Sequence, residues 1–207
     1  MENRVYTEAM FAIPIGKVMV DQKICDELKS LKGLNQDTNP DLYHWNVLKD
    51  YPEIKKKLLS LFIPWVSGIG GSRVDWVMTT SWVTENIKGE EMSRHRHLNA
   101  LYSGVLYFDK VHEAHPRLGF ENPIEIFTRN TIEPVACRED YQRNVFNATE
   151  YYAEIREGLM IFFPSYLIHK HPSFTAPFPR KSLAFNLFPV GKLSDADSMF
   201  DTNLLSY

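Results

Sequence analysis

The stretch SWVTENIKGEEMSRHRHLNALYSGVLYF, residues 81–108, carries both a fold signal and a chemical signal. It begins and ends with short runs rich in Val, Thr, Trp, Tyr and Phe, which favour β-strands. Two histidines, His95 and His97, stand one residue apart just before the second run. Because side chains alternate across an extended chain, both imidazoles would project to the same face. A strand can in this way offer two nitrogen ligands to one metal ion.

The same β pattern recurs over the C-terminal two thirds of the chain. The runs are short, and turn-forming or charged residues separate them, which predicts an all-β sandwich or barrel. They cover residues 72–86, 100–108, 124–129, 151–155, 159–164 and 182–190. Residues 111–120 are expected to form a turn, with His112 and His115 at the surface. Residues 128–150 show no clear periodicity and are expected to form a long loop, a kind of segment that often carries function.

The N-terminal third predicts one strand and two helices. The strand should lie within residues 11–20. The first helix should begin at Asp21, whose side chain can cap it, and end by Gly33. The second should begin near Tyr51 and end at Pro64 and the glycines that follow. Its buried stripe would consist of Ile54, Leu58, Leu61 and Phe62. Both helices are expected to pack against the β-core.

Length and composition indicate one folded domain. A chain of 207 residues with 44% hydrophobic residues is long enough for one well-formed core. We expect a single domain over 1–207, with supporting elements in 1–71, the β-core in 72–190 and a tail in 191–207. A net charge of −3 argues against a general nucleic-acid binder.

Cysteine usage and the N-terminus indicate the cell compartment. Cys25 and Cys137 lack the spacing of a zinc ribbon or a disulfide framework, so both are expected to be small buried hydrophobes. The apolar stretch at residues 9–20 is short and contains Pro14, and we find no signal peptide or membrane span. The protein is therefore expected in the cytoplasm.

A second stretch, EGLMIFFPSYLIHKHP at residues 157–172, could complete a metal site. A proline turn follows its apolar strand, and His169 comes five residues after that turn. A returning strand could bring His169 beside His95 and His97, which would form a facial triad with open coordination positions. His171 shares the parity of His169. It could support the site, but we expect it to face solvent.

A third stretch, RKSLAFNLF at residues 180–188, suggests an anion site. An arginine on a core strand is unusual unless it meets an anion, because an unpaired buried charge is costly. The guanidinium of Arg180 could bind a carboxylate through two parallel hydrogen bonds, and Ser182 could donate its hydroxyl to the same group. The alternative is that Arg180 lies at the exposed start of the strand.

These three stretches together resemble the 2-oxoglutarate- and Fe(II)-dependent oxygenases over about residues 80–190. The pattern is similar to a prolyl-hydroxylase-like branch found often in phages and marine bacteria. The resemblance implies a double-stranded β-helix (jelly-roll) core with the N-terminal helices packed on one sheet. It also implies that Fe(II) is bound by His95, His97 and His169, and that Arg180 and Ser182 hold the remote carboxylate of 2-oxoglutarate. Asn99, a nearby oxygen donor, is a further candidate for cofactor binding.

The implied activity is decarboxylation of 2-oxoglutarate by O₂, coupled to hydroxylation of a small-molecule or peptide substrate such as a peptidyl proline. No membrane or nucleic-acid partner is expected. The oligomeric state is left open by the sequence, and a homodimer is one possibility. A phage-encoded chain would act in the host cytoplasm. One departure is His97, because the superfamily usually has Asp or Glu at this position. Three neutral ligands would leave the iron more positive.

Two other functions remain open from the sequence. A metal-dependent dioxygenase of the cupin type would share the jelly roll and would not use 2-oxoglutarate. Its glutamate after the HxH pair is absent here, and Arg180 has no cupin counterpart. A non-catalytic jelly-roll binding module is the other alternative, and it would need neither iron nor cosubstrate.

Overall fold

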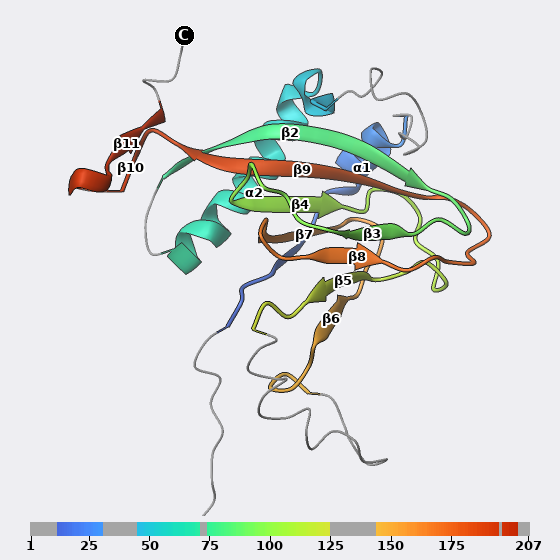
Figure 1. Cartoon of the computed structure of the whole chain (residues 1–207). Helices are drawn as coiled ribbons and strands as arrows, with labels where there is room; N and C mark the ends of the chain where they lie inside the picture. The colour runs from blue at the N-terminus through green and yellow to red at the C-terminus, as the bar shows by residue number, and fades with distance from the viewer. Residues whose placement is uncertain (1–11, 31–44, 71–73, 125–143, 195, 203–207) are drawn as a thin grey trace, which may run out of the picture.

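Two antiparallel sheets form the body of the protein. The computed structural model describes residues 12–30, 45–70, 74–124, 144–194 and 196–202. The larger sheet contains five strands in the order β1 (Gly16–Met19), β7 (Leu159–Pro164), β4 (Tyr102–Leu106), β9 (Arg180–Val190) and β2 (Asp75–Asn86). The smaller sheet contains β3 (Met92–His95), β8 (His169–His171), β5 (Leu118–Glu121) and β6 (Glu150–Ala153). This arrangement is the predicted double-stranded β-helix (Figure 1).

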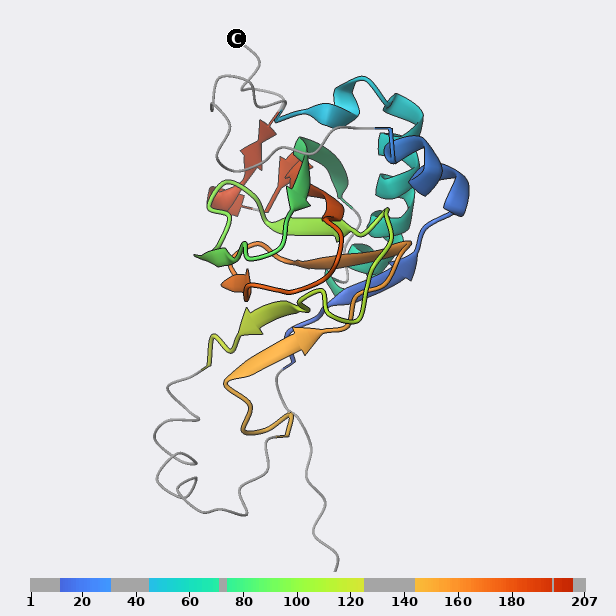
Figure 2. The ribbon, with the colours of Figure 1, turned by 90° about the vertical axis from the view of Figure 1, so that its right-hand side faces the viewer.

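Two helices cover the outer face of the five-stranded sheet (Figure 2). Helix α1 (Gln22–Leu28) begins as predicted, because the Asp21 side chain accepts a hydrogen bond of 2.8 Å from the backbone N–H of Lys23. The helix ends at Leu28, while the predicted end at Gly33 lies outside the described residues. A short 3₁₀ helix, η2 (Val47–Lys49), precedes helix α2 (Pro52–Gly70).

Helix α2 ends at Gly70, one of the glycines predicted to close it, but Pro64 lies inside the helix and does not end it. Proline removes the N–H that would bond to the carbonyl of Ser60. Ser60 and Pro64 are both exposed, so water can reach that carbonyl. On the opposite face Phe62 and Val66 are buried against the sheet, and this packing stabilises the helix on both sides of the proline.

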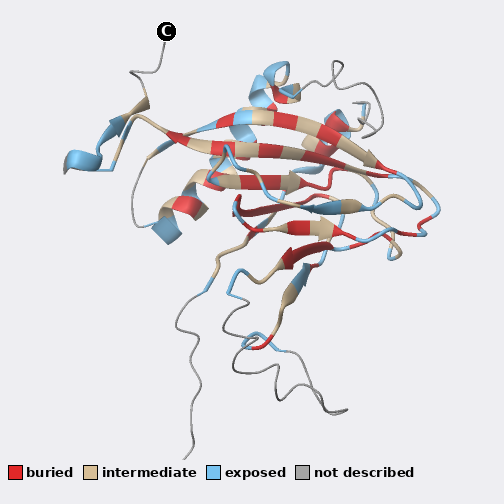
Figure 3. Cartoon of the chain, in the orientation of Figure 1, coloured by how far each residue is buried: buried red, intermediate tan, exposed pale blue. Residues whose placement is uncertain are grey.

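One apolar layer lies between the larger sheet and the helices. Buried residues alternate with less buried ones along much of β9 (Figure 3). On β9, Leu183, Phe185 and Leu187 point to the helices, where they pack with the buried stripe of α2. The predicted stripe holds for Ile54, Leu58 and Phe62, whereas Leu61 is only half-buried.

The second apolar layer fills the space between the two sheets. It joins Leu159, Ile161 and Phe163 of β7 to Leu118 and Phe120 of β5. Strand β7 therefore contributes to both layers, which explains why its sequence is a continuous apolar run instead of an alternating one. Leu118 and Phe163 of this layer also line the cavity next to the histidines.

The turn expected at residues 111–120 is only partly correct, because Leu118–Glu121 forms strand β5. His115 is buried and only 4% exposed, so its expected surface position is wrong. Its Nε2 donates to the carbonyl of Phe178 at 2.9 Å, and its Nδ1 accepts from the backbone N–H of His112. These bonds satisfy the ring inside the fold. Most of the strand expected at 124–129 and of the loop expected at 128–150 lies outside the described residues.

After β9, residues Lys192–Leu193 (β10) and Phe200–Asp201 (β11) form a small hairpin around a 3₁₀ turn, η4 (Ala196–Ser198). Cys25 is buried, as expected, and Cys137 is outside the described residues. Of the helices in the described ranges, none is long and apolar enough to cross a membrane.

Candidate active site

Three histidines predicted as ligands meet at one end of the smaller sheet. His95 on β3 lies directly opposite His169 on β8, because a bulge between Met92 and His95 shifts the register of this strand pair. His97 follows β3, and its backbone N–H donates to the carbonyl of Ser165 at 3.0 Å. The ring centroids are 4.3 Å apart for His95 and His169 and 5.4 Å apart for His95 and His97. One ring nitrogen from each histidine lies within 4.8 Å of the other two.

Backbone carbonyls fix the orientation of two of these rings. Nδ1 of His95 is 2.8 Å from the carbonyl of Ser93, and Nδ1 of His169 is 2.9 Å from the carbonyl of Leu167. A carbonyl can only accept, so each Nδ1 must carry the proton. A neutral imidazole with its proton on Nδ1 presents the lone pair of Nε2, which is the form that binds a metal.

His97 is fixed by a side-chain network. Its Nδ1 donates to Oδ1 of Asn186 at 2.6 Å and lies 2.9 Å from Oγ of Ser103. Nδ2 of Asn186 donates to the hydroxyl of Thr80 at 3.0 Å, which turns Oδ1 toward the histidine. The Ser103 hydroxyl also contacts the hydroxyl of Ser165 at 2.8 Å. All three histidines thus use Nδ1 within the protein and leave Nε2 for a ligand.

Burial favours the neutral form of His169 and His97. It lowers the pKa of His169 to about 3, and the nearby histidines lower it further. Burial also lowers the pKa of His97, although the hydrogen bond to Asn186 opposes that effect. A metal competes with protons for a ring nitrogen, so a low pKa favours metal binding at neutral pH.

A cavity of about 110 Å³ adjoins the three histidines and lies between the sheets. Its walls come from both sheets, with Trp82 of β2 and Ser182 of β9 on the larger sheet and Leu118 of β5 on the smaller one. Ser182 is 5% exposed and lies opposite Thr84 in the sheet. The cavity is smaller than the roughly 300–1,000 Å³ typical of drug-sized ligands, and it suits a small metabolite.

Arg180 lines the same cavity and is 3% exposed, which rules out the exposed strand start as its environment. One terminal nitrogen donates to the carbonyl of Pro116 at 2.8 Å, and the other donates to Oδ1 of Asn86 at 3.2 Å. The guanidinium lies 5.5 Å from the ring centroid of Tyr107. Its Nε has no hydrogen-bond partner, and no carboxylate of the described residues pairs with it. Burial accordingly lowers the pKa of Arg180.

The structure places two residues differently from the sequence predictions. Asn99 is exposed and does not line the cavity, so the structure does not bring it together with the other candidates. His171 was expected to face solvent, and this is wrong because it is 2% exposed and lines the cavity. It shares the inner face of β8 with His169, as their common parity implies.

The sequence analysis also missed two residues that hold His97, namely Asn186 and Ser103. Asn186 has the same parity on β9 as Arg180 and Ser182, so the signal that selected those two residues was available for it as well. Ser103 on β4 becomes relevant only through its cross-strand pairing with Asn186, which the sequence does not reveal.

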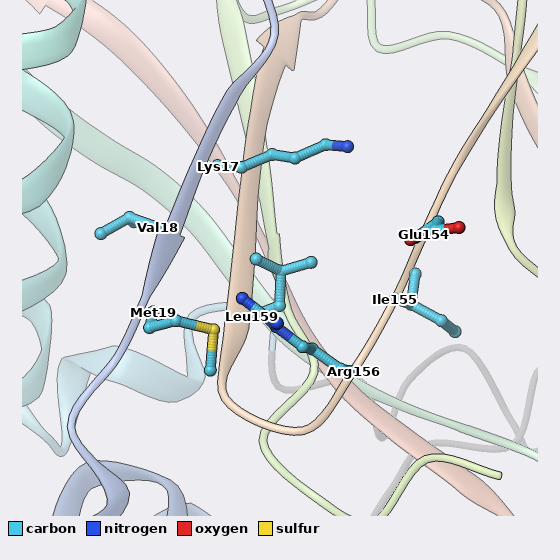
Figure 4. Close-up of a pocket in the computed structure, with 7 residues that line it drawn as sticks. All are labelled: Lys17, Val18, Met19, Glu154, Ile155, Arg156 and Leu159. Carbon is cyan, nitrogen blue, oxygen red and sulfur yellow. The ribbon is translucent and has the colours of Figure 1, made fainter.

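A second hollow, of about 300 Å³, lies at the β1 edge of the larger sheet and shares no lining residue with the histidine cavity. Figure 4 shows it beside Lys17 and Met19 of β1, with Glu154 and Arg156 on the segment between β6 and β7. It contains no histidine, so it offers none of the nitrogen ligands of the first site.

Comparisons with known proteins agree with this geometry. Residues 80–186, more than half of the chain, match the model of the family described as "Putative 2OG-Fe(II) oxygenase". These residues include the three histidines, Arg180, Ser182 and Asn186. A search of curated proteins found no match.

Solved structures share the fold at low identity. HygX from Streptomyces hygroscopicus, with nickel and 2-oxoglutarate bound, is 10% identical, with a TM-score of 0.54 over 86% of this chain and 83% of HygX. A Pseudomonas putida prolyl-4-hydroxylase is 12% identical, with a TM-score of 0.51 over 92% and 88% of the two chains.

SnoN, an alpha-ketoglutarate-dependent epimerase from nogalamycin biosynthesis, is 9% identical, with a TM-score of 0.57 over 88% of this chain and 82% of SnoN. At such identities these structures show the fold, and the match over residues 80–186 shows the family. The chain therefore belongs to the 2-oxoglutarate- and Fe(II)-dependent oxygenases, and its cofactors are Fe(II) and 2-oxoglutarate.

Proposed function

We propose that the protein is a hydroxylase in which His95, His97 and His169 bind Fe(II), and Arg180 with Ser182 binds the remote carboxylate of 2-oxoglutarate. The observation that carries this proposal is one cavity with two chemically different ends. At one end, three histidines bring one ring nitrogen each within 4.8 Å of one another, while their Nδ1 atoms bond within the protein. A buried guanidinium without a carboxylate partner lies at the other.

The donor set fits Fe(II) and a dicarboxylate. Imidazole nitrogen is a good ligand for iron, and an iron held by these three histidines would have coordination positions left for the cosubstrate and O₂. A buried, unpaired guanidinium is costly, so an anion that pairs with it would bind strongly. The three ligands are neutral, so the dianion also meets the full charge of Fe(II).

The residues of the chain would position the reactants and exclude water. Fe(II), when bound with 2-oxoglutarate and O₂, supplies the oxidation in which 2-oxoglutarate is decarboxylated to succinate and one oxygen atom enters the substrate. Arg180 and Ser182 would fix the far end of the cosubstrate, and the apolar layer around Phe163 would keep the pocket dry. Hydroxylation is the simplest outcome for the substrate, a small molecule or a peptide.

The whole chain would act as one unit in this reaction. The N-terminal helices share an apolar layer with β9, the strand that carries Arg180 and Ser182. We therefore propose a single oxygenase domain over 1–207, in which residues 1–71 support the β-core at 72–190.

Cosubstrate turnover tests the proposal. Protein reconstituted with Fe(II) should convert 2-oxoglutarate to succinate in the presence of O₂, slowly without a substrate and faster with one. Arg180→Ala should raise the 2-oxoglutarate concentration needed for half-maximal turnover by at least about tenfold, because a hydrogen-bonded charge contributes about 1.5–3 kcal/mol.

The iron content of Arg180→Ala should stay the same, because Arg180 does not contact the histidine ligand atoms. Lys181→Ala is a matched control on the other face of β9, where Lys181 lies opposite Glu85. Iron uptake without succinate formation under any oxygenated condition would contradict the use of 2-oxoglutarate and favour a cupin-type enzyme or a binding module.

A further inference from the structure

Two buried nitrogen atoms in the cavity lack a hydrogen-bond partner. They are Nε of Arg180 and Nε2 of His171, and in the described part of the chain no other buried side-chain nitrogen or oxygen is unpaired. Both residues line the cavity and are almost fully buried. An unsatisfied buried polar atom costs about 1–3 kcal/mol. Two such atoms on residues that line one cavity indicate a ligand that would bond to both.

We propose that His171 is a second anchor, together with Arg180, for the remote carboxylate of 2-oxoglutarate. This inference rests on the proposed function, because it assigns a further residue to the same cosubstrate site. His171 belongs to β8 of the smaller sheet, and Arg180 belongs to β9 of the larger one. The carboxylate would therefore connect the two sheets across the cavity.

The spacing along each sheet supports this assignment. On β8, His171 lies two residues beyond His169 on the same face, which corresponds to about 7 Å along the strand. A five-carbon dicarboxylate spans a comparable length. On β9, Asn186 contacts the metal-site histidine His97, and Arg180 lies at the other end of the same face. On β8 and on β9, the residue at the metal site and the residue proposed to bind the carboxylate are thus separated along the strand in the same direction.

The hydrogen bonds of His171 show how it could donate to a carboxylate. Its Nδ1 lies 3.1 Å from the carbonyl of Pro172, which can only accept, so the proton is on Nδ1 and Nε2 is a lone pair. Donation to a carboxylate requires the other tautomer, in which the proton has moved from Nδ1 to Nε2. No proton is gained or lost in this exchange.

The tautomer exchange replaces a weak bond by a stronger one. Pro172 is exposed, so water can take over the hydrogen bond to its carbonyl. The new bond joins an N–H to a charged oxygen, and such bonds are roughly twice as strong as those between neutral groups. The ligand therefore supplies the free energy that selects the second tautomer.

Calorimetry on the Zn(II)-loaded full-length protein tests the proposal without requiring activity. The two probes are 2-oxoglutarate and 2-oxopentanoate, which has the same chain length and a methyl group in place of the remote carboxylate. His171→Phe should weaken 2-oxoglutarate binding by about 10- to 100-fold, the loss expected for one hydrogen bond to a charged group. It should leave the affinity for 2-oxopentanoate unchanged.

Two further variants separate a specific contact from a structural effect. His171→Gln retains an N–H donor and should recover part of the lost affinity. Lys170→Met, on the opposite face of β8, should bind both acids as the wild type does. Equal weakening of both acids in His171→Phe, or no weakening of either, would overturn the assignment of His171.

A spectroscopic measurement keeps the proposal testable if His171→Phe fails to fold. In ¹⁵N NMR spectra of the Zn(II)-loaded wild type, the Nε2 resonance of His171 should change from the unprotonated to the protonated type when 2-oxoglutarate is added. An unchanged resonance at saturating 2-oxoglutarate would refute the tautomer exchange and the contact. If the wild type bound no 2-oxoglutarate at all, the proposed function itself would fail instead.

Discussion

Replacing Asn186 should loosen the metal site although this residue offers no ligand atom to the metal. Its Oδ1 accepts a hydrogen bond of 2.6 Å from Nδ1–H of His97. This bond fixes the orientation of the ring, so that Nε2 is left for the metal at the cluster of three histidines. Groups that orient a metal-binding histidine typically change metal affinity by 10- to 100-fold. In Asn186→Leu the hydroxyl of Ser103, 2.9 Å from the same Nδ1, remains as a substitute acceptor. We therefore expect about a tenfold loss, equivalent to about 1.4 kcal/mol.

The double variant Asn186→Leu/Ser103→Ala removes both acceptors and should lose about 100-fold. Asn186→Asp keeps an oxygen acceptor and adds a negative charge, so it should bind metal at least as tightly as the wild type. Competition with a chromophoric chelator measures each affinity, and the free energy of unfolding of the metal-free proteins controls for folding. Wild-type affinity in the double variant would refute the role of this network.

Three other predictions follow from the fold and the histidines. Gly104→Ala should lower the free energy of unfolding by about 1–3 kcal/mol, because the added Cβ would lie 2.3 Å from the Phe185 ring. The control Gly68→Ala, on the exposed side of α2 with nothing within 4 Å, should raise it by about 0.5–1 kcal/mol. Chemical denaturation measures both, and equal effects would contradict the packing described. Burial lowers the pKa of His115 from its ordinary value of 6.5. As pH falls, His115 therefore takes up a proton in the unfolded protein at a higher pH than in the folded protein, and the free energy of unfolding decreases below about pH 6.5. His115→Gln should therefore lose less stability than the wild type between pH 7.5 and pH 5, and identical losses would contradict this. In His97→Asp the metal should remain bound, because a carboxylate can replace the imidazole at this coordination position; inductively coupled plasma mass spectrometry measures the metal content, and an empty site would contradict it.

The site features that could be predicted from the sequence depend on the alternation of side chains along a single strand. The parity of His95 and His97, the proline turn before His169, and the shared face of Arg180 and Ser182 all follow from the two-residue period of a strand. The structure places these five side chains around one cavity. The cap of α1 and most of the buried stripe of α2 were predictable for the same reason, because they follow from spacing along a single element.

Features that depend on tertiary neighbours were not predictable. His171 and His115 were assigned to the surface, yet the opposite sheet covers the first and the Phe178 segment covers the second. Pro64 was expected to help the following glycines end α2, yet packing of the next turn against the sheet carries the helix through the proline to Gly70. The bulge that places His95 opposite His169 likewise arises from strand pairing.

The most direct test of the central claim is the visible spectrum of the protein with Fe(II) and 2-oxoglutarate in the absence of O₂. Chelation of Fe(II) by the 2-oxo acid in the histidine site should produce a weak charge-transfer band that saturates at one equivalent of each. We predict that the band is present in the wild type, absent in His169→Ala, and shifted to higher 2-oxoglutarate concentrations in Arg180→Ala. Iron binding without any band in the wild type, or an unchanged band in His169→Ala, would contradict the account.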